Sequence, residues 1–147
     1  MRSFIALFCV LFLSSPALAD EQPSLPRFAS IKSGKANLRV GPGENYPIIW
    51  VYKRSGLPVE IIEEHQLWRK VRDPEGDEGW MLKNLLTGNR TVVVTAEKIA
   101  LRRKPESTAP TICYASRNVI LHVEEGLKEW CMVSRDNKQG WADKKSL

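Results

Sequence analysis

The chain has 147 residues, of which 43% are hydrophobic, and a formal net charge of +5 at pH 7. The positive excess is small and is scattered among acidic residues, so it indicates a solvated surface with at most loose attraction to an anionic cell wall or membrane. Such a modest charge argues against nucleic-acid binding. Only one long apolar run is present, near the N-terminus, so stable membrane insertion of the mature protein is not expected.

The first 19 residues have the pattern of a cleaved secretory signal peptide. Arg2 supplies the positive start, residues 4–13 form the apolar run, and residues 17–19 form a small-residue cleavage site. The run is shorter than the roughly 20 residues that a membrane-spanning helix needs. We therefore expect residues 1–19 to be removed and the mature protein to be exported, either periplasmic or secreted. Residues 20–26 then form a short extended lead-in.

After the lead-in, the chain contains the same set of short motifs twice. The matched pairs are Leu38 and Leu101, Trp68 and Trp130, and Trp80 and Trp141. The spacing between partners shrinks from 63 to 61 residues along the chain, as two one-residue deletions in loops would produce. Self-similarity at a nearly fixed period indicates a duplicated structural unit. The sequence therefore predicts two domains, over residues 27–87 and 88–147.

Each unit is predicted to be built from strands. Its segments are short, rich in β-branched and aromatic residues, and separated by Gly, Pro, Asn and Asp. In the first unit they are residues 28–32, 48–53, 58–62, 68–72 and 80–83, and in the second 91–95, 112–115, 119–123, 130–134 and 141–143. About five strands in roughly 60 residues suffice for one small, closed or nearly closed β-barrel.

One aligned pair of residues makes a specific backbone prediction. Gly56 in the first unit corresponds to Asn118 in the second. Asparagine is the non-glycine residue that best accepts a positive φ. We therefore expect the same left-handed turn in both units, with only the side chain changed.

The first copy carries a longer series of spaced motifs. They are Ala36-Asn37-Leu38-Arg39-Val40-Gly41-Pro42-Gly43, Tyr46-Pro47, Gly56, Trp68-Arg69-Lys70-Val71 and Gly79-Trp80. This series resembles the bacterial SH3 domain, and its tandem arrangement resembles exported bacterial proteins made of two such domains. The resemblance implies an all-β fold of two small SH3-like β-barrels. It also implies a binding role, often alongside cell-wall hydrolases, with peptidoglycan peptides as a frequent ligand class. The second copy departs from the series, with Arg103, Lys104 and Glu106 in place of Val40, Gly41 and Gly43.

Comparison of the two copies separates scaffold residues from specialised ones. Aromatic residues that recur in both copies are most simply core residues or residues that close a barrel. They are Trp68, Trp80, Trp130 and Trp141.

Tyr46 and Trp50 differ, because Ala109 and Cys113 replace them in the second copy. Exposed aromatics beside a Gly-Pro-Gly loop would form a partly apolar platform for a peptide or sugar, although filling the core is an equally good interpretation. The candidate ligand-binding residues are therefore Tyr46, Trp50, Asn37 and Arg39.

Two cysteines, Cys113 and Cys131, remain after removal of the signal peptide. An even number of cysteines in an exported chain is typical of a disulfide, which by the chain-entropy model would contribute about 3 kcal/mol. The alternative is two separate thiols, buried or reactive. With His122 they form the only combination suited to a cysteine hydrolase, and in an exported protein pairing or burial is the better interpretation.

No metal site or cofactor is expected. His65 and His122 do not occupy equivalent positions and have no ligand-like spacing. The acidic group at Asp73, Glu75 and Asp77 lacks the spacing of a calcium loop and lies in a predicted hairpin tip, which favours a solvated turn.

The sequence therefore predicts a non-catalytic binding module of the cell envelope. Its first domain would recognise peptidoglycan or an envelope protein. The alternatives are a periplasmic protein-interaction adaptor that binds no wall polymer and, less favoured, a small cysteine hydrolase.

Overall fold

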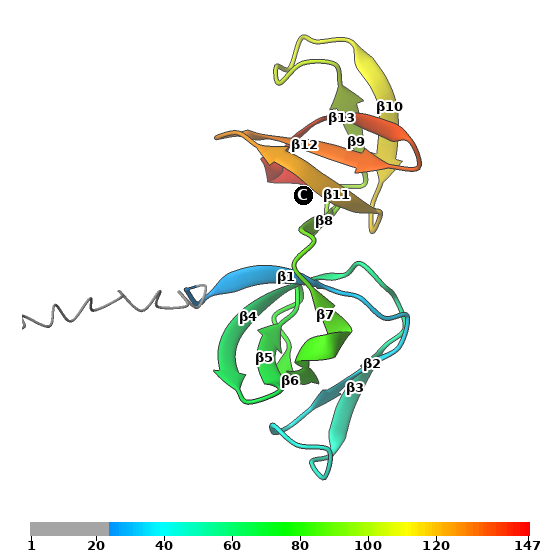
Figure 1. Cartoon of the computed structure of the whole chain (residues 1–147). Helices are drawn as coiled ribbons and strands as arrows, with labels where there is room; N and C mark the ends of the chain where they lie inside the picture. The colour runs from blue at the N-terminus through cyan, green and yellow to red at the C-terminus, as the bar shows by residue number, and fades with distance from the viewer. Residues whose placement is uncertain (1–23) are drawn as a thin grey trace, which may run out of the picture.

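The computed structural model describes residues 24–147, and these residues form two antiparallel β-sheets joined by a short connection (Figure 1). The predicted signal peptide, residues 1–19, and the start of the lead-in lie outside the described residues. The all-β prediction is confirmed, since the only helical segments among residues 24–147 are two three-residue 3-10 turns. Within this range no helix is long and apolar enough to cross a bilayer.

The first sheet contains seven strands in the order β3-β2-β6-β5-β4-β1-β7. Their bounds are β1 (Arg27–Ile31), β2 (Ala36–Arg39), β3 (Ile48–Tyr52), β4 (Pro58–His65), β5 (Trp68–Arg72), β6 (Glu78–Leu82) and β7 (Leu86–Thr87), with the 3-10 turn η1 (Lys83–Leu85) before β7. Every pairing between neighbouring strands is antiparallel.

The second sheet repeats this arrangement with six strands in the order β10-β9-β13-β12-β11-β8. Their bounds are β8 (Thr91–Val93), β9 (Lys98–Arg102), β10 (Thr111–Ser116), β11 (Ile120–Gly126), β12 (Trp130–Arg135) and β13 (Lys138–Asp143), followed by the 3-10 turn η2 (Lys144–Ser146). Strand for strand, the order matches that of the first sheet without β7. The repeat seen in the sequence is therefore a repeat of topology.

Neither sheet closes into the expected barrel. Among the described residues, the end strands β3 and β7 do not pair with each other, and neither do β10 and β8. One strand pairing inside each sheet is also very short. Strand β2 pairs with β6 only at Arg39 opposite Trp80, and β9 pairs with β13 only at Arg102 opposite Trp141. The chain turns into a loop directly after each arginine, so the ladder ends there.

A β-bulge interrupts the alternation of side chains in β4. The pairing of β4 with β5 shifts between Ile61 and Glu63, so Ile62 is the extra residue. A bulge of this kind resets the alternation of inward and outward side chains. Ile61 is accordingly buried whereas Ile62 is half-buried. The pairing of β11 with β12 shifts at the equivalent place, between Val123 and Glu125.

Each sheet encloses its own small apolar core. The first core contains Ala29, Ile31, Ala36, Leu38, Tyr52, Val59, Ile61, Val71 and Met81, and the second contains Val94, Ile99, Leu101, Ala115, Leu121, Cys131, Val133 and Ala142. The tryptophans predicted to be structural lie beside these cores. Trp68, Trp80 and Trp141 are 8%, 9% and 9% exposed, while Trp130 is half-buried.

Hydrogen bonds between the domains fix the junction around residues 88–90. The hydroxyl of Ser30 donates to the carbonyl oxygen of Asn89 over 2.8 Å, and the hydroxyl of Thr91 donates to the carbonyl oxygen of Gly56 over 2.7 Å. Ser30 and Thr91 are also the buried polar residues of the described chain. Burying a hydroxyl without a hydrogen-bond partner costs free energy, so Ser30 and Thr91 are buried favourably only when the two domains are docked.

The predicted pair of left-handed turns is confirmed and lies at the same junction. Gly56 has a φ of 80° and Asn118 a φ of 65°. The guanidinium of Arg54 in the first domain donates to the carbonyl oxygen of Asn118 in the second. The two turns thus supply backbone acceptors for contacts between the domains.

Candidate functional site

The loop between β2 and β3 is packed around the ring of Tyr46. A Cβ atom built on Gly41 would lie 2.5 Å from two carbons of that ring, and one built on Gly43 would lie 3.1 Å from it. The two glycines therefore leave the space that the ring occupies. Tyr46 is still 42% exposed, so its ring covers the loop with one face and meets solvent with the other.

Arg39 holds the end of this loop. Its Nη1 atom donates to the carbonyl oxygen of Tyr46 over 2.7 Å. The loop is also fixed by backbone bonds from Val40 to Pro47, from Gly43 to Gly41 and from Tyr46 to Gly43. The guanidinium of Arg39 is thus committed to the loop, which makes Arg39 a residue that shapes the candidate site.

The equivalent loop of the second domain has the same bonds without the ring. Arg102 donates to the carbonyl oxygen of Ala109 over 2.8 Å, and the three backbone bonds recur at the matching positions. Lys104 and Glu106 stand where the first domain has glycines, while Ala109 stands where it has Tyr46. The second domain therefore lacks both the aromatic ring and the glycines that make room for it. The recurrence of Arg39 as Arg102 was a sequence signal for its structural role.

The strand β3 presents a row of exposed apolar side chains at the end of the first sheet. Ile48, Ile49 and Trp50 are 46%, 49% and 61% exposed. A shallow hollow lies beside them, lined by residues 50–53. Since β3 is an end strand, the backbone groups on its outer side have no strand partner within the first sheet.

The four sequence-predicted ligand residues are not all on one face. Asn37 pairs with Val51, and Leu38 pairs with Trp50. Directly paired residues share a face and successive residues alternate, so Asn37 and Trp50 point to opposite sides of the β2–β3 hairpin. Tyr46 and Arg39 lie together at the loop, while Trp50 stands on the strand with Ile48 and Ile49.

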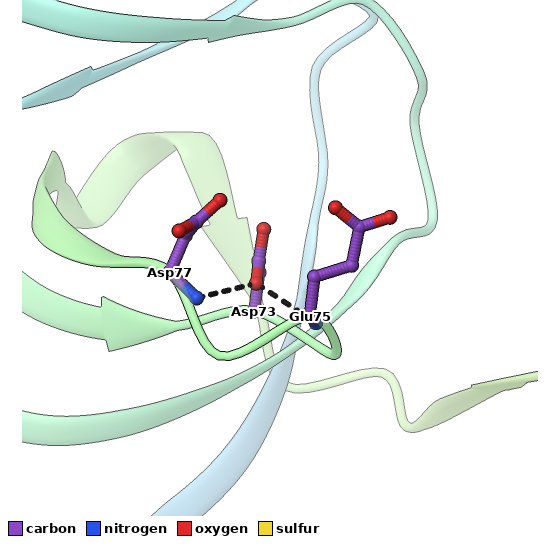
Figure 2. A group of neighbouring side chains, drawn as sticks. All are labelled: Asp73, Glu75 and Asp77. Atoms are coloured by element: carbon purple, nitrogen blue, oxygen red, sulfur yellow. Dashed lines mark hydrogen bonds between the residues drawn. The ribbon is translucent and has the colours of Figure 1, made fainter.

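The acidic tip between β5 and β6 is a structured turn (Figure 2). One carboxylate oxygen of each of Asp73, Glu75 and Asp77 lies within 4.8 Å of the others. Asp73 Oδ1 accepts from the backbone amides of Glu75 and Asp77 at 3.0 and 2.9 Å, as Figure 2 shows. Its other oxygen accepts from the hydroxyl of Tyr52 at 2.9 Å. The carboxylate of Asp73 is therefore occupied in holding the turn to the first core.

The bond to Asp73 also affects the phenol of Tyr52. Burial, the hydrogen bond to Asp73 and the nearby carboxylates together raise the pKa of Tyr52 well above its ordinary value. The hydroxyl thus remains a proton donor throughout the physiological range.

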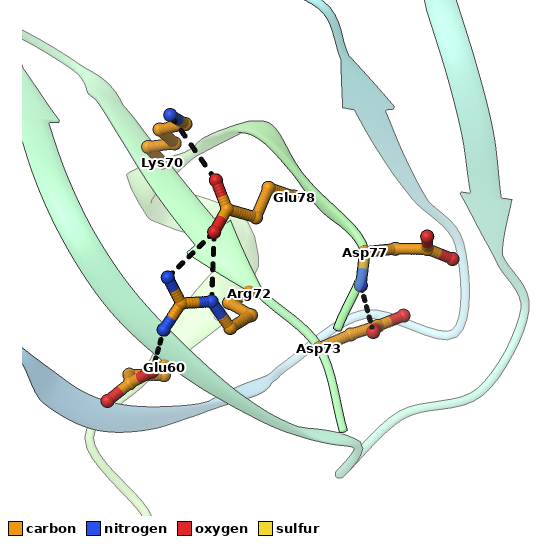
Figure 3. A network of polar contacts seen from close by, with 6 residues as sticks. All are labelled: Glu60, Lys70, Arg72, Asp73, Asp77 and Glu78. Atoms are coloured by element: carbon orange, nitrogen blue, oxygen red, sulfur yellow. Dashed lines mark hydrogen bonds and ion pairs between the residues drawn. The ribbon is translucent and has the colours of Figure 1, made fainter. Parts of the chain in front are cut away.

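A row of cross-strand ion pairs runs over the outer side of β4, β5 and β6 (Figure 3). Arg72 Nη1 lies 2.9 Å from Glu60, and Arg72 Nη2 lies 2.7 Å from Glu78, which also pairs with Lys70 at 3.4 Å. The hydrogen bond from Arg72 is the main cause that lowers the pKa of Glu78. These charges bind neighbouring strands to one another, so they are poorly placed to bind a ligand.

The predicted disulfide is absent, because Cys113 and Cys131 are both free thiols. They lie on β10 and β12, with β9 and β13 between them in the sheet. Three strand spacings separate them along the sheet, so the two cysteines do not lie on neighbouring strands. Cys131 is instead a core residue, and Cys113 packs against that core.

Cys131 is also badly placed for catalysis with His122. His122 pairs with Ser134, which is three residues from Cys131 and therefore about 10 Å along the strand. Burial raises the pKa of Cys131, which keeps it in the less nucleophilic thiol form.

Two hollows lie between the domains, and no sequence motif indicated either of them. One, of about 600 Å³, has polar and basic walls that include Lys32, Arg54 and Arg135. The other, of about 540 Å³, has mainly apolar walls that include Phe28, Val93 and Val123. Such sites depend on how the two domains are placed relative to each other, which the pattern within each repeat does not encode.

Comparison with solved structures finds similarity to three proteins. They are an NlpC/P60 family protein from Bacillus cereus ATCC 10987 (18% identity, TM-score 0.38), NlpC1 from Trichomonas vaginalis (12%, 0.35) and NlpC2 from Trichomonas vaginalis (11%, 0.36). The matches cover 82%, 93% and 85% of this chain but 55%, 50% and 48% of those chains. The chain thus spans about half the length of these proteins. No curated protein matches the chain.

The bacterial SH3 domain family matches the chain over residues 32–88 and again over residues 95–147. The two matches fall on the two sheets and include the loop, the recurring tryptophans and the Gly-Trp pairs described above. The chain belongs to the bacterial SH3 domain family and carries this domain twice.

Proposed function

We propose that this protein is a non-catalytic binding module of the cell envelope, and that its first domain recognises peptidoglycan through β3. The observation that carries the proposal is the exposure of Trp50, which is 61% accessible on an end strand with exposed neighbours Ile48 and Ile49. Membership of the bacterial SH3 domain family supports the ligand class. The export signal predicted from the sequence would bring the protein to that ligand.

The chemistry of β3 suits a wall peptide or glycan. An exposed indole offers a flat apolar face on which a sugar ring or a short side chain can lie. Free backbone groups on the outer side of an end strand can pair with an extended peptide. The strand carries no charged residue between Ile48 and Tyr52, so pairing with another strand would bury no charge on β3.

Differences between the two domains support a site in the first. In the second domain Cys113 replaces Trp50 and is half-buried against the core. The exposed aromatic of that domain is Tyr114, whose partner Ala100 lies on the opposite face from the core residue Leu101. Lys98 covers its ring, with the Nζ atom 4.2 Å from the ring centroid.

A periplasmic adaptor that binds a protein partner is the second candidate. It is favoured by the open edges of β3 and β10, neither of which contains a charged residue. Natural edge strands usually carry charges or prolines that prevent pairing with another chain. Crosslinking in intact cells that finds one protein partner, together with no sedimentation with wall sacculi, would establish the adaptor in place of the wall-binding function.

The direct test is sedimentation of the full chain with purified peptidoglycan sacculi. We expect the wild type to sediment, Trp50→Ala to remain in the supernatant, and Tyr114→Ala to behave as the wild type. Tyr114 is a matched control, because it is also 61% exposed and lies on the equivalent strand of the second domain. Failure of the wild type to sediment, or equal losses in both variants, would refute wall binding through β3.

A further inference from the structure

We propose that the apolar groove between the two domains is a second binding site, for an extended segment of a partner protein that carries acidic and apolar side chains. This site is independent of β3, because it is formed by β1, β4, β8 and β11 where the domains meet. In Figure 1, β8 lies on the side of the second sheet that faces β1.

The walls of the groove come from both domains. Phe28, Pro58 and Pro74 belong to the first domain, and Val93 and Val123 belong to the second. Phe28 is 68% exposed, the highest value among the large apolar side chains of the described chain. The volume of about 540 Å³ is large enough for several side chains of a bound peptide. An open apolar wall of this kind gains stability when a partner covers it.

Two cations at the groove have no partner within residues 24–147. Arg90 and Lys144 both line it, and neither forms an ion pair with any described acidic group, the carboxylate of Leu147 included. Lys144 reaches over the backbone of Gly126, where its Nζ atom lies 3.8 Å from the place of a Cβ. Both cations lie close enough to Cys131 to oppose the rise in its thiol pKa that burial causes.

The acidic residues of the groove are already engaged. Glu60 pairs with Arg72 at 2.9 Å. Asp73 accepts hydrogen bonds from Tyr52 and from the amides of its own turn. The side chains that line the groove therefore carry one more positive than negative charge, with Arg72, Arg90 and Lys144 against Glu60 and Asp73. An anionic ligand fits this balance and a cationic one does not.

A bound peptide can form hydrogen bonds with the backbone of the groove as well as contacts with its side chains. The strand β8 ends the second sheet, so its outer backbone groups have no strand partner within that sheet. An extended segment can pair with such an edge, place alternate side chains against the valines and direct the others toward the cations. The junction bonds of Ser30 and Thr91 hold the two walls in place before binding.

The experiment is an amide NMR titration of the full chain with the peptide Val-Glu-Val-Glu-Val, acetylated and amidated at its ends. Two control peptides replace either the glutamates by lysine or the valines by serine. We expect the acidic apolar peptide to shift amides near Val93, Val123 and Lys144, and both controls to shift them much less. Added salt should weaken the binding.

Variants then locate the site. Lys144→Glu should weaken binding about tenfold, and Phe28→Ala should weaken it as well. Lys145→Glu should bind as the wild type, because this neighbouring lysine is exposed and does not line the groove. The exposed positions of Lys144 and Phe28 make these changes compatible with folding, which a dispersed spectrum verifies.

Three results would overturn the proposal. They are an absence of shifts with the acidic apolar peptide at millimolar concentration, equal binding of the lysine peptide, or an equal loss in Lys144→Glu and Lys145→Glu. Trp50→Ala separates this site from the one on β3, since it should leave the titration unchanged. Loss of sacculus binding and loss of groove binding can therefore be told apart.

Discussion

The fit between Tyr46 and Gly41 predicts a strong, measurable coupling between these two positions. A Cβ on Gly41 would lie 2.5 Å from the Tyr46 ring, closer than real contacts allow. Gly41 has no positive φ, so alanine meets no backbone strain there. Gly41→Ala should therefore destabilise the first domain only by displacing the ring, at a cost of about 2 kcal/mol, as for other overpacked sites. For a domain of this size, that lowers Tm by about 10 °C.

The assay is a double-mutant cycle with Tyr46→Ala, followed by calorimetry of the full chain. In the Tyr46→Ala background the ring no longer occupies the space beside Gly41. Gly41→Ala should then stabilise the domain by about 0.5 kcal/mol, because alanine lowers the conformational entropy of the unfolded chain. The expected coupling energy is about 2 kcal/mol. Gly34→Ala is the control, because no atom lies within 4 Å of its Cβ position. If Gly41→Ala costs the same with and without the ring, the packing explanation is wrong.

Three further predictions concern single groups. Tyr52→Phe removes the hydrogen bond to Asp73 and should cost about 1.5 kcal/mol in urea unfolding; an unchanged midpoint would contradict the role assigned to that bond. In the native protein at mildly alkaline pH, iodoacetamide should label half-buried Cys113 before Cys131, because burial raises the pKa of the Cys131 thiol. Equal labelling rates of the two cysteines in mass spectrometry would disprove this. The pKa of Glu78 lies below its ordinary value of 4.5, so the ionised carboxylate stabilises the fold above pH 4.5. The Tm difference between the wild type and Glu78→Gln should therefore be present at neutral pH and shrink as the pH falls below 4.5. A difference that is constant with pH would refute the last prediction.

The parts of the fold that each repeat encodes locally could be predicted from the sequence. The recurring tryptophans and Gly-Trp pairs predicted a duplicated unit, because equivalent residues lie on equivalent strands. The strand order was not predicted, and the predicted strands omitted β2 and β9. Gly56 and Asn118 gave the left-handed turns, because few residue types accept a positive φ. For Tyr46 and Trp50 an exposed platform and core filling were equally good interpretations, and both side chains are exposed.

Other features depend on geometry that residue types do not specify. Asn37 and Trp50 face opposite ways because Asn37 pairs with Val51 and Leu38 pairs with Trp50, and residue types do not specify this register. The two cysteines suggested a disulfide by number and compartment alone, while the strand order separates them. The groove beside β8 exists only when both domains are docked, so no motif within one repeat could reveal it.

The most direct test of the central claim is an amide NMR titration of the full chain with soluble peptidoglycan fragments. If the first domain binds wall polymer through its end strand, the largest shifts will fall on Ile48, Ile49 and Trp50, and Trp50→Ala will abolish them. The equivalent strand β10 will remain unaffected. Shifts confined to the second domain, or a wild-type spectrum unchanged at saturating fragment concentration, would contradict the claim.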